Sequence, residues 1–457
     1  MKEKILNIYY HILARLARFY VKKHKPFVIW VCGSVGKTSC RMIVSQILQA
    51  GLKGKKIVTS EKNFNGELWL SLSIFQIEKF EPTVWCLIQT YCKIRLKTFF
   101  GKKPYDVIFL EYGIDHPWEM NFLLSIVKPE IWIFTSIDKV HSLQFGDPDV
   151  IAREEALLIK NTKEIAFINM SDQYGRQLMD KLDIDIFRYH TEETSDETDI
   201  HYVHNQLIKN HDHISSKATL FIKKQKITVE TNLIGKENLW YIWVWLCIKD
   251  ILAHRFSISL PKSSDTVKIT ITLQPWRFTL FKGLRDSILI DSSYNAAPMS
   301  MRKVLDSVYA IKKECLKSHK IIACLGDMRE LGDFEEQEHR LLAWPVSQIA
   351  DVVVAVGTNS VNHFSDELRK IWYPSEQIFP YLSSVLAGEK IKEIIKENSH
   401  QNYIVVFKWS QNTIFLEEAV KVNLADSEKR KKLPRQSKRW LSTKKKFFET
   451  MHQFSAF

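Results

Sequence analysis

One stretch constrains this chain more than any other. An apolar run over residues 27–32 leads into two glycines and a Lys-Thr pair, and a helical pattern follows: Gly33-Ser34-Val35-Gly36-Lys37-Thr38-Ser39. Glycines let the backbone approach a ligand closely, and a helix start offers unpaired N–H groups and a positive dipole end. Lys37 adds a full charge, and the Thr38 hydroxyl suits Mg²⁺. The stretch predicts a strand, a phosphate-binding loop and a helix.

Only the short form of the phosphate-loop motif is present. The general motif has a glycine five residues before Gly36, where this chain has Val31. A six-residue match also fits a strand-turn-helix corner with an incidental lysine, so the rest of the chain has to decide between the two.

Length and composition bound the class of protein. A chain of 457 residues should hold two or three domains, and 45% hydrophobic with 26% charged residues is typical of a globular protein. The longest uncharged apolar run, residues 239–248, is far shorter than the roughly 20 residues of a membrane-spanning helix. No secretory signal pattern opens the sequence, so the protein is expected to be cytoplasmic.

Seven cysteines are scattered without a Cys-x-x-Cys pair, which favours reduced core residues over a zinc site or disulfides. Much of the net charge of +13 comes from the two ends. Such a surplus suits nucleic acid, an anionic membrane or polyanionic nucleotides. No recognition motif with interleaved aromatic and basic residues is present, so no nucleic acid is expected as a partner.

The two ends differ in pattern. Residues 1–24 alternate apolar and basic side chains at helical spacing and predict a basic amphipathic helix, which either lies on an anionic membrane or, as the default, packs on the following domain. Residues 426–457 form a basic run broken by aromatics. The default for this tail is solvation, and contact with anionic lipid or nucleic acid is the alternative.

Strands alternate with helices after the loop, at residues 56–59, 106–110 and 130–135. This pattern predicts a doubly wound parallel sheet, in which ligands bind at the carboxyl ends of the strands. Glu111 follows the second of these strands directly, so its carboxylate is placed at that edge.

Several further motifs follow the loop along the chain. They are Asn63-Phe-Asn65, Leu110-Glu-Tyr-Gly113, His141, Phe145-Gly146, Gly235-Lys-Glu-Asn238, Pro275-Trp-Arg277, Asp291-Ser-Ser-Tyr294-Asn295-Ala-Ala-Pro298, Leu325-Gly-Asp-Met-Arg-Glu-Leu-Gly332 and Lys408-Trp-Ser410. Their order resembles that of the Mur ligases, and the chain is most similar to the MurF type, whose members join D-alanyl-D-alanine to the UDP-muramoyl tripeptide.

The resemblance implies an α/β fold in which a central doubly wound P-loop ATPase domain, residues 25–274, precedes a smaller Rossmann-like C-terminal domain, residues 275–425. The strands expected in the latter are residues 287–290, 320–325, 351–355 and 403–407. The family's N-terminal domain, which grips the UDP-sugar, has no counterpart ahead of the loop. The uridine end would then be held by other means.

The implied activity is ATP- and Mg²⁺-dependent amide-bond formation by a monomer, with a muramoyl peptide and D-alanyl-D-alanine as substrates. The acid's carboxylate attacks ATP, and the amine attacks the acyl phosphate, so that ADP and phosphate leave. Two rivals remain: a Mur-type ligase for a different, non-UDP acid, and a non-catalytic nucleotide-binding subunit.

The same resemblance assigns roles residue by residue. The catalytic residues would be Lys37, His141 and Glu155; the metal ligands Thr38, Glu111 and His141; the nucleotide contacts Gly33, Ser34, Val35, Gly36, Lys37, Thr38, Ser39, Asn238, Arg277 and Asp291; the substrate contacts Asn63, Asn65, Tyr294, Asn295 and Lys408. The plain structural alternatives are a strand-end surface residue for Glu111, a loop histidine for His141 and a helix cap for Asn238.

The chain departs from the family at a functional position. Relatives carry a lysine, modified by CO₂ to a carbamate, where the register places Glu155. Lys160 lies five residues further on, a helix face about 140° away, so it cannot substitute. We expect Glu155 to act as a permanent carboxylate, kept ionised by nearby Mg²⁺. Trp409 and Gln411 also alter a Lys-Gly-Ser-Arg string, so the amine pocket is expected to differ.

Overall fold

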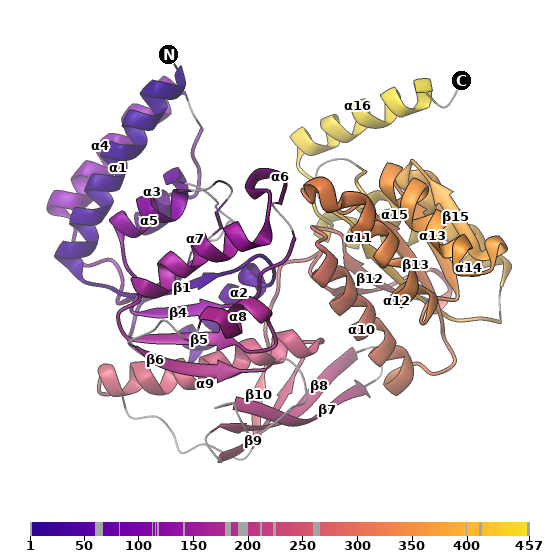
Figure 1. Ribbon diagram of the computed structural model, residues 1–457, viewed down its shortest axis with the longest axis horizontal. Coiled ribbons are helices and arrows are strands. Elements are labelled where there is room, and N and C mark those ends of the chain that lie inside the picture. Colours follow the sequence, from indigo (N-terminus) through magenta and orange to yellow (C-terminus); the bar gives the residue numbers. More distant parts are fainter. Residues whose placement is uncertain are drawn as a thin grey trace. The chain divides into compact units, whose positions relative to one another are not determined.

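The computed structural model describes most of the chain, and its residues fall into two compact units (Figure 1). The first comprises Met1–Ile137, Gln144–Asn205 and Ser216–Thr272, and the second Asp138–Leu143, Gln206–Ser215 and Leu273–Phe457. The described residues are 2–59, 67–81, 83–111, 113–114, 116, 118–139, 142–178, 184–190, 200–210, 213–222, 225–258, 266–398, 400–410 and 414–454.

The first unit is built on a sheet with the strand order β10-β9-β8-β7-β6-β5-β4-β1-β3-β2, parallel from β2 to β6. Central strands β1, β4 and β5 are buried along their whole length, which is why they read as continuous apolar runs. The strands are β1 Phe27–Cys32, β2 Ile57–Thr59, β3 Val107–Glu111, β4 Ile131–Phe134, β5 Ile165–Asn169, β6 Asp185–Tyr189, β7 Ile200–Asn210, β8 His213–Ile222, β9 Gln225–Thr231 and β10 Thr266–Ile269.

Helices cover this sheet in the doubly wound manner that the sequence predicts. Helices α1, α3, α5 and α7 share one core cluster with the central strands, whereas α2 packs against α9. The helices are α1 Lys2–His24, α2 Lys37–Gly51, α3 Glu67–Ile74, α4 Val84–Phe100, α5 Glu119–Ile126, α6 Ser142–Phe145, α7 Pro148–Lys160, α8 Gln173–Leu178 and α9 Lys236–Arg255. Residues 239–248 of α9 are all buried, so this run is a core helix as predicted.

The amphipathic helix α1 packs on the first unit, in agreement with the default expectation. Its residues Leu13, Ala14, Ala17 and Tyr20 are buried in the core cluster that also contains Phe75. Across the residues that the structure describes, no helix is long and apolar enough to cross a bilayer.

The second unit holds a six-stranded sheet with the order β11-β12-β16-β13-β14-β15, parallel except for β11. The four strands expected here are β12 Ile288–Ser292, β13 Lys320–Gly326, β14 Val352–Val356 and β16 Tyr403–Lys408, joined by β11 Thr279–Lys282 and β15 Ile378–Tyr381. The helices are α10 Pro298–Cys315, α11 Glu335–Leu341, α12 Ala343–Ser347, α13 Ser365–Lys370, α14 Ser384–Glu397, α15 Glu417–Asn423 and α16 Lys438–Phe454. Both units are α/β, so the predicted fold class is confirmed.

The expectation of a solvated C-terminal tail is wrong. Residues 427–432 form the short helix η6 (Ser427–Lys432), and α16 then packs on the second unit. Trp440, Phe447 and Phe448 lie against the core around Phe415, and Lys444 is only 3% exposed. The prediction rested on the many lysines of this segment, which indicate exposure. The helical spacing of its aromatic residues instead places them on one side of α16, and that side is buried.

All seven cysteines are free, but they are not all core residues. Cys32, Cys40, Cys247 and Cys324 are buried as expected. Cys86 and Cys315 are half-buried, and Cys92 is exposed on α4.

Candidate functional site

The predicted loop joins β1 to α2 and is bent at its two glycines. Gly33 has φ +118° and Gly36 has φ +90°, which is the left-handed region that side chains rarely adopt. A Cβ on Gly33 would lie 2.7 Å from Ser136 O, and one on Gly36 would collide with the Tyr241 hydroxyl of α9. Both positions therefore require glycine.

The end of β4 holds the loop in this shape. The Ser34 N–H donates to Ser136 O at 2.6 Å. The Thr135 N–H and hydroxyl both donate to Cys32 O, at 3.0 and 2.9 Å. Because these contacts lie within one unit, the loop is fixed by the fold before any ligand binds.

The loop concentrates positive charge at the start of α2. Lys37 opens the helix, no side chain caps its N-terminus at Gly36, and its first turn contains no acidic residue. The Lys37 ammonium folds back on the loop and donates to Gly33 O and, at 3.4 Å, to Ser34 O. A helix N-terminus with an adjacent lysine is an anion-binding arrangement.

Glu111, at the end of β3, faces α2. Its Oε1 accepts a hydrogen bond from the Thr38 hydroxyl at 2.5 Å, and its Oε2 pairs with Arg41 Nε at 2.8 Å. The Glu111 side chain is 4% exposed, so it is not a strand-end surface residue. Arg41 also donates to Thr59 Oγ1 at 3.0 Å.

Sequence reasoning missed Arg41, although the signal was present. An arginine on the apolar face of a helix becomes buried, and a buried cation needs a partner. Arg41 lies three residues after Thr38, so it reaches the same carboxylate from the same helix.

Glu155 is buried in α7 and points at the loop. Its Oε1 accepts the Gly33 N–H at 3.2 Å, whereas its Oε2 has no hydrogen-bond partner among the described residues. Burial raises the pKa of this carboxyl, although the Cys32 thiol, the Lys37 ammonium and the Gly33 amide oppose the rise. The expectation that a nearby Mg²⁺ keeps Glu155 ionised stays a prediction.

The other residues assigned to this part of the site divide into two groups. Asn238 is buried in the first turn of α9, and its amide donates to Ile234 O at 2.7 Å; the helix is capped by Gly235, so Asn238 is not the helix cap considered as its structural alternative. Asn63, Asn65 and His141 lie outside the described residues.

The second unit brings together its own predicted residues, because β12 and β16 pair with Ser292 opposite Lys408. The Lys408 ammonium is buried and donates to Asn295 O at 2.9 Å and to Ser292 Oγ at 3.4 Å. The Ser410 hydroxyl donates to Asn295 Oδ1 at 3.0 Å. Lys408 therefore orders the Asn295 loop from beneath.

Asp291 is completely buried beside this loop. Its Oδ1 accepts the Ser293 N–H at 2.9 Å, and its Oδ2 has no hydrogen-bond partner within the described chain. Burial raises the pKa of Asp291 to about 6; the Ser293 hydrogen bonds oppose this rise and the Glu417 carboxylate adds to it.

Tyr294 lies among aromatic and cationic groups. The Trp276 ring stacks on it with centroids 5.9 Å apart, and the Arg277 guanidinium lies 5.2 Å from its centre. Arg435, from the C-terminal segment, lies 5.8 Å from Tyr294 and 5.2 Å from the Trp409 ring. Such cation–ring contacts are attractive.

Arg435 is tied into the second unit by an ion pair that sequence reasoning missed. Its NH1 pairs with Glu417 Oε2 at 3.2 Å, and its NH2 donates to Tyr294 O at 3.3 Å. Lys444 pairs with the other Glu417 oxygen at 2.8 Å. Nothing in a run rich in lysine and arginine distinguishes Arg435, so only the fold identifies it.

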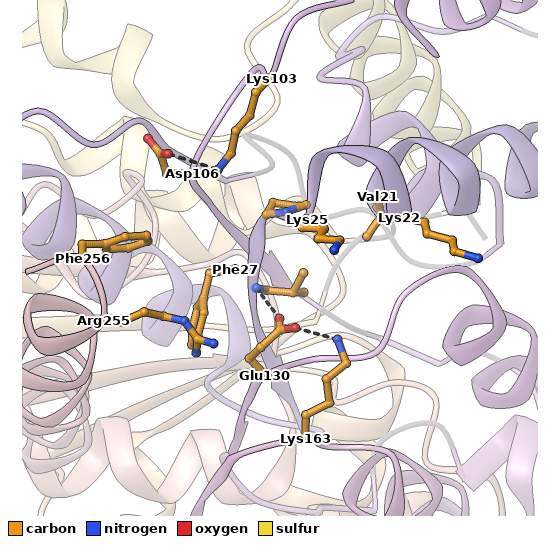
Figure 2. A pocket seen from close by; sticks show the side chains of 12 residues that line it. Val21, Lys22, Lys25, Phe27, Lys103, Asp106, Glu130, Lys163, Arg255 and Phe256 are labelled. Carbon is orange, nitrogen blue, oxygen red and sulfur yellow. Dashed lines mark hydrogen bonds and ion pairs between the residues drawn. The ribbon is translucent and has the colours of Figure 1, made fainter. Parts of the chain in front are cut away.

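A separate basic pocket lies near the amino ends of the strands of the first unit (Figure 2). Its volume is about 460 Å³, and Phe27 and Phe256 form part of its wall. The Glu130 carboxylate accepts the Val28 N–H at 2.7 Å and pairs with Lys163 at 2.6 Å. Its cations are Lys22, Lys25, Lys103, Lys163 and Arg255. The sequence analysis did not foresee this pocket, because its residues come from distant segments.

Comparison with known proteins identifies two domains in the chain. A model of the Mur ligase middle domain matches residues 31–240, and a model of the Mur ligase glutamate ligase domain matches residues 276–408. The UDP-N-acetylmuramoyl-tripeptide–D-alanyl-D-alanine ligase of Bacillus subtilis is 24% identical over 413 residues, which cover 90% of this chain and 78% of that protein. The enzyme of the same name from Borreliella burgdorferi is 24% identical over 352 residues, which cover 76% of this chain and 65% of that protein.

Solved structures show the same fold. MurF from Acinetobacter baumannii superposes with a TM-score of 0.66 at 18% identity, over 88% of this chain and 77% of that one. MurF ligase from Thermotoga maritima, solved in complex with ADP, also gives 0.66, at 19% identity over 92% and 84% of the two chains. The models of the two Mur ligase domains match consecutive parts of the chain that together make up most of it, so the chain belongs to the Mur ligase family.

Proposed function

We propose that this protein is an ATP-dependent ligase that joins an acid to an amine through an acyl phosphate, with release of ADP and phosphate. We further propose that it adds D-alanyl-D-alanine to a muramoyl peptide in peptidoglycan precursor synthesis, as the named relatives do. The observation that carries the proposal is the preformed loop with Lys37 at its helix start and the Thr38–Glu111 pair beside it.

The loop is proposed to bind the phosphates of ATP. Phosphoryl transfer needs alignment and charge neutralisation more than covalent help from the protein. Lys37 supplies a cation at the loop, and the uncapped start of α2 supplies oriented N–H groups. Because Ser136 and Tyr241 fix the loop, little reorganisation is needed when the nucleotide binds.

Thr38 and Glu111 are proposed to hold Mg²⁺. Their Oγ1 and Oε1 atoms lie 2.5 Å apart, so both oxygens face one point. Mg²⁺ prefers hard oxygen ligands and takes only one or two from protein when phosphates and waters complete its shell. This fits the described residues, in which no group of three His, Cys, Asp or Glu side chains forms a metal cluster. The ion would neutralise charge that develops on the phosphates.

Glu155 is proposed to replace the carbamate of the relatives without CO₂ chemistry. Its Oε1 is used by the Gly33 amide, while its buried Oε2 is left to accept a further donor or cation. A cation beside this oxygen would offset the desolvation that raises its pKa. The Glu155 carboxylate would then bind the Gly33 amide of the loop through Oε1 and a cation through Oε2.

In the second unit, Tyr294 and Asn295 are proposed to contact the acid or amine substrate, and Lys408 and Arg435 to position them. Lys408 is already engaged with Asn295 O and Ser292 Oγ. Arg435 fixes the backbone and ring of Tyr294 at once. Lys408 was predicted to contact the substrate. We propose instead that it acts indirectly, by positioning Asn295.

One observation favours a second candidate, a non-catalytic nucleotide-binding subunit: Glu155 occupies the Gly33 N–H, a donor of the loop. The experiment that separates the candidates measures ADP release by the full chain with ATP and Mg²⁺ alone, with UDP-muramoyl tripeptide, with D-alanyl-D-alanine, and with both. The ligase requires both. Release only when the acid is exchanged for a non-UDP acid would favour the other ligase, and nucleotide binding without release in any mixture would favour the subunit.

A further inference from the structure

Helices α1 and α4 lie side by side in the first unit (Figure 1). The Tyr9 hydroxyl donates to Leu87 O at 2.9 Å, and the Lys23 ammonium donates to Phe99 O at 2.9 Å. The Phe19 and Phe99 rings approach to 5.8 Å between centroids. Early residues of one helix meet early residues of the other, and late meet late, so the two run in the same direction.

The inner sides of this α1–α4 pair are anchored in the core. Leu13, Ala17 and Tyr20 of α1 and Ile94 of α4 are buried in the same cluster. The Thr98 side chain of α4 is completely buried as well. The pair is therefore a fixed part of the first unit.

The outer side of α4 is apolar, which is unusual for a helix facing water. Every fourth residue along it is exposed: Val84, Ile88, Cys92, Leu96 and Phe100. Four residues make about 400° of rotation, so the row turns by about 40° at each step and by about 160° from Val84 to Phe100, which keeps it within one half of the helix surface. Trp85 is 68% exposed and Phe100 82%.

Helix α1 extends this apolar surface. Together with α4 it presents nine large exposed apolar side chains, which we call the α1–α4 face: Ile8, Ile12, Phe19, Val84, Trp85, Ile88, Leu96, Phe99 and Phe100. The Phe19–Phe99 ring contact joins the two helices' contributions. No other part of the described chain places so many exposed apolar side chains on neighbouring helices.

Most charges around the α1–α4 face are positive, although α1 also contains Glu3 and Lys103 pairs with Asp106 at 3.3 Å. No Asp or Glu occurs in residues 4–25 or in residues 84–103. The exposed cations of these two segments are Arg15, Arg18, Lys22, Lys23, Lys25, Lys93, Arg95, Lys102 and Lys103. Three of them, Lys22, Lys25 and Lys103, also line the basic pocket, so the positive surface continues beyond the helix ends (Figure 2).

We propose that the α1–α4 face docks on the surface of an anionic phospholipid bilayer. Apolar side chains enter the boundary between headgroups and acyl chains, aromatic rings anchor there, and the cations meet lipid phosphates. Charge complementarity selects this occupant. A second copy of the chain would bring two cationic surfaces together, and like charges repel.

The other basic helix does not offer such a face. On α16 the aromatic residues Trp440, Phe447 and Phe448 pack against the second unit, and Lys444 is buried in an ion pair. Docking is therefore assigned to the N-terminal pair rather than to the C-terminal segment. It does not depend on the ligase chemistry, and it is tested without any turnover.

A probe on Cys92 tests the contact directly, because this exposed cysteine lies in the middle of the apolar row of α4. In a Cys86→Ser/Cys315→Ser background, an environment-sensitive fluorophore on Cys92 should shift to the blue with vesicles that contain phosphatidylglycerol. Pure phosphatidylcholine vesicles should produce a much smaller shift. The same dye on an introduced Leu441→Cys, exposed on α16, in a background that also carries Cys92→Ser, is the control and should not respond.

Co-sedimentation of the full chain with the same vesicles separates the two components of binding. Trp85→Ser/Phe100→Ser should lower the bound fraction about tenfold, whereas Trp344→Ser, an exposed tryptophan of the second unit, should not change it. Arg15→Glu/Lys93→Glu should abolish the preference for anionic vesicles, with Lys431→Glu/Lys432→Glu as the matched control. Binding should also fall steeply with salt.

Three results would overturn the proposal. They are an unchanged Cys92 spectrum with anionic vesicles, equal sedimentation of the Trp85→Ser/Phe100→Ser variant and the parent, and a dimer in analytical ultracentrifugation that Trp85→Ser dissolves. The last result would identify a second copy of the chain as the occupant. Unchanged thermal melts of each variant show that the fold is retained.

Discussion

Glu155 Oε1 accepts a hydrogen bond from the Gly33 N–H at 3.2 Å, which joins helix α7 to the first glycine of the phosphate-binding loop. The contact is buried, and Lys37 and Cys32 are the neighbours that oppose the rise of the Glu155 pKa. The residue expected at the position of the family's CO₂-dependent group therefore touches the loop itself.

We predict that turnover is independent of CO₂. A lysine carbamate exists only in equilibrium with bicarbonate, whereas the Glu155 carboxyl is permanent. We expect removal of bicarbonate to leave the rate unchanged and Glu155→Lys to create a bicarbonate-responsive enzyme. ADP release in degassed and in bicarbonate-supplemented buffer measures both. A loss of parent activity on degassing would contradict this account.

Glu155→Gln separates structure from charge at the same position. The amide oxygen can still accept the Gly33 N–H, so nucleotide affinity and melting temperature should persist. Removing the ionisable group should slow turnover about tenfold or more and raise the Mg²⁺ concentration required. Parent-like turnover at low Mg²⁺ would exclude Glu155 from the metal site.

Lys37→Ala and Thr38→Ala should each weaken Mg²⁺-ATP binding while the fold survives. Lys37 bonds only to loop carbonyls, and neither residue belongs to the apolar core. Loss of a charged hydrogen-bonding group costs about 1.5–3 kcal/mol, or roughly tenfold to a hundredfold in affinity. Isothermal titration with a non-hydrolysable ATP analogue checks this. Lys53→Ala, an exposed lysine just after α2, serves as the control.

Asp291 should make stability depend on pH. Folding raises its pKa from 3.8 to about 6, so the folded state binds more protons than the unfolded state between these values. The contribution is zero below the unfolded pKa; a penalty then grows between pH 3.8 and about 6 and reaches up to about 3 kcal/mol above the folded pKa. Asp291→Asn keeps the acceptor for Ser293 N–H and removes the charge, so it should be more stable than the parent at pH 7 and similar at pH 4.

Denaturant unfolding of both proteins across this pH range measures the difference. A difference between Asp291→Asn and the parent that stays constant with pH would show that Asp291 does not titrate between its unfolded and folded pKa values. Ser293→Ala isolates the contribution of the Ser293 hydroxyl to the Asp291 pKa, because the backbone N–H of residue 293 still donates to Asp291 after the substitution.

Arg435→Ala should destabilise the second unit and loosen the Tyr294 loop together. Glu417 is completely buried and would keep only Lys444, and breaking one side of a buried ion pair costs about 3–5 kcal/mol. In a double-mutant cycle with Glu417→Gln, the losses of unfolding free energy in the two single variants should sum to much more than the loss in the double variant. Arg439→Ala, an exposed arginine of α16, should be neutral. Additive losses would show that Arg435 and Glu417 act separately.

Local patterns explain what could be predicted from the sequence. The loop, α2 and Glu111 follow one another along a strand-turn-helix pattern and a strand end, so neighbouring residues suffice to place them. The expected strands of both sheets are likewise continuous apolar runs. The functional roles of Asn63, Asn65 and His141 remain predictions, since these residues lie outside the described ones.

Long-range placement explains what could not be predicted. Arg435 reaches Tyr294 across more than a hundred residues of sequence, and nothing in its own neighbourhood marks it. The sequence of α4 is as apolar as that of a buried helix, so its exposed row can be recognised only once the fold shows that α4 packs beside α1. The raised pKa of Glu155 likewise depends on burial by segments that are distant in the sequence.

The most direct test of the central claim follows an oxygen atom. UDP-muramoyl tripeptide carrying heavy oxygen in its reacting carboxylate is incubated with ATP, Mg²⁺, D-alanyl-D-alanine and the full chain, and the released phosphate is analysed by mass spectrometry. An acyl phosphate attacked by the amine must leave one carboxylate oxygen on the phosphate, so we predict heavy phosphate in a one-to-one ratio with the amide product. Unlabelled phosphate, or phosphate without amide product, would contradict the assignment of this protein as a ligase for these substrates.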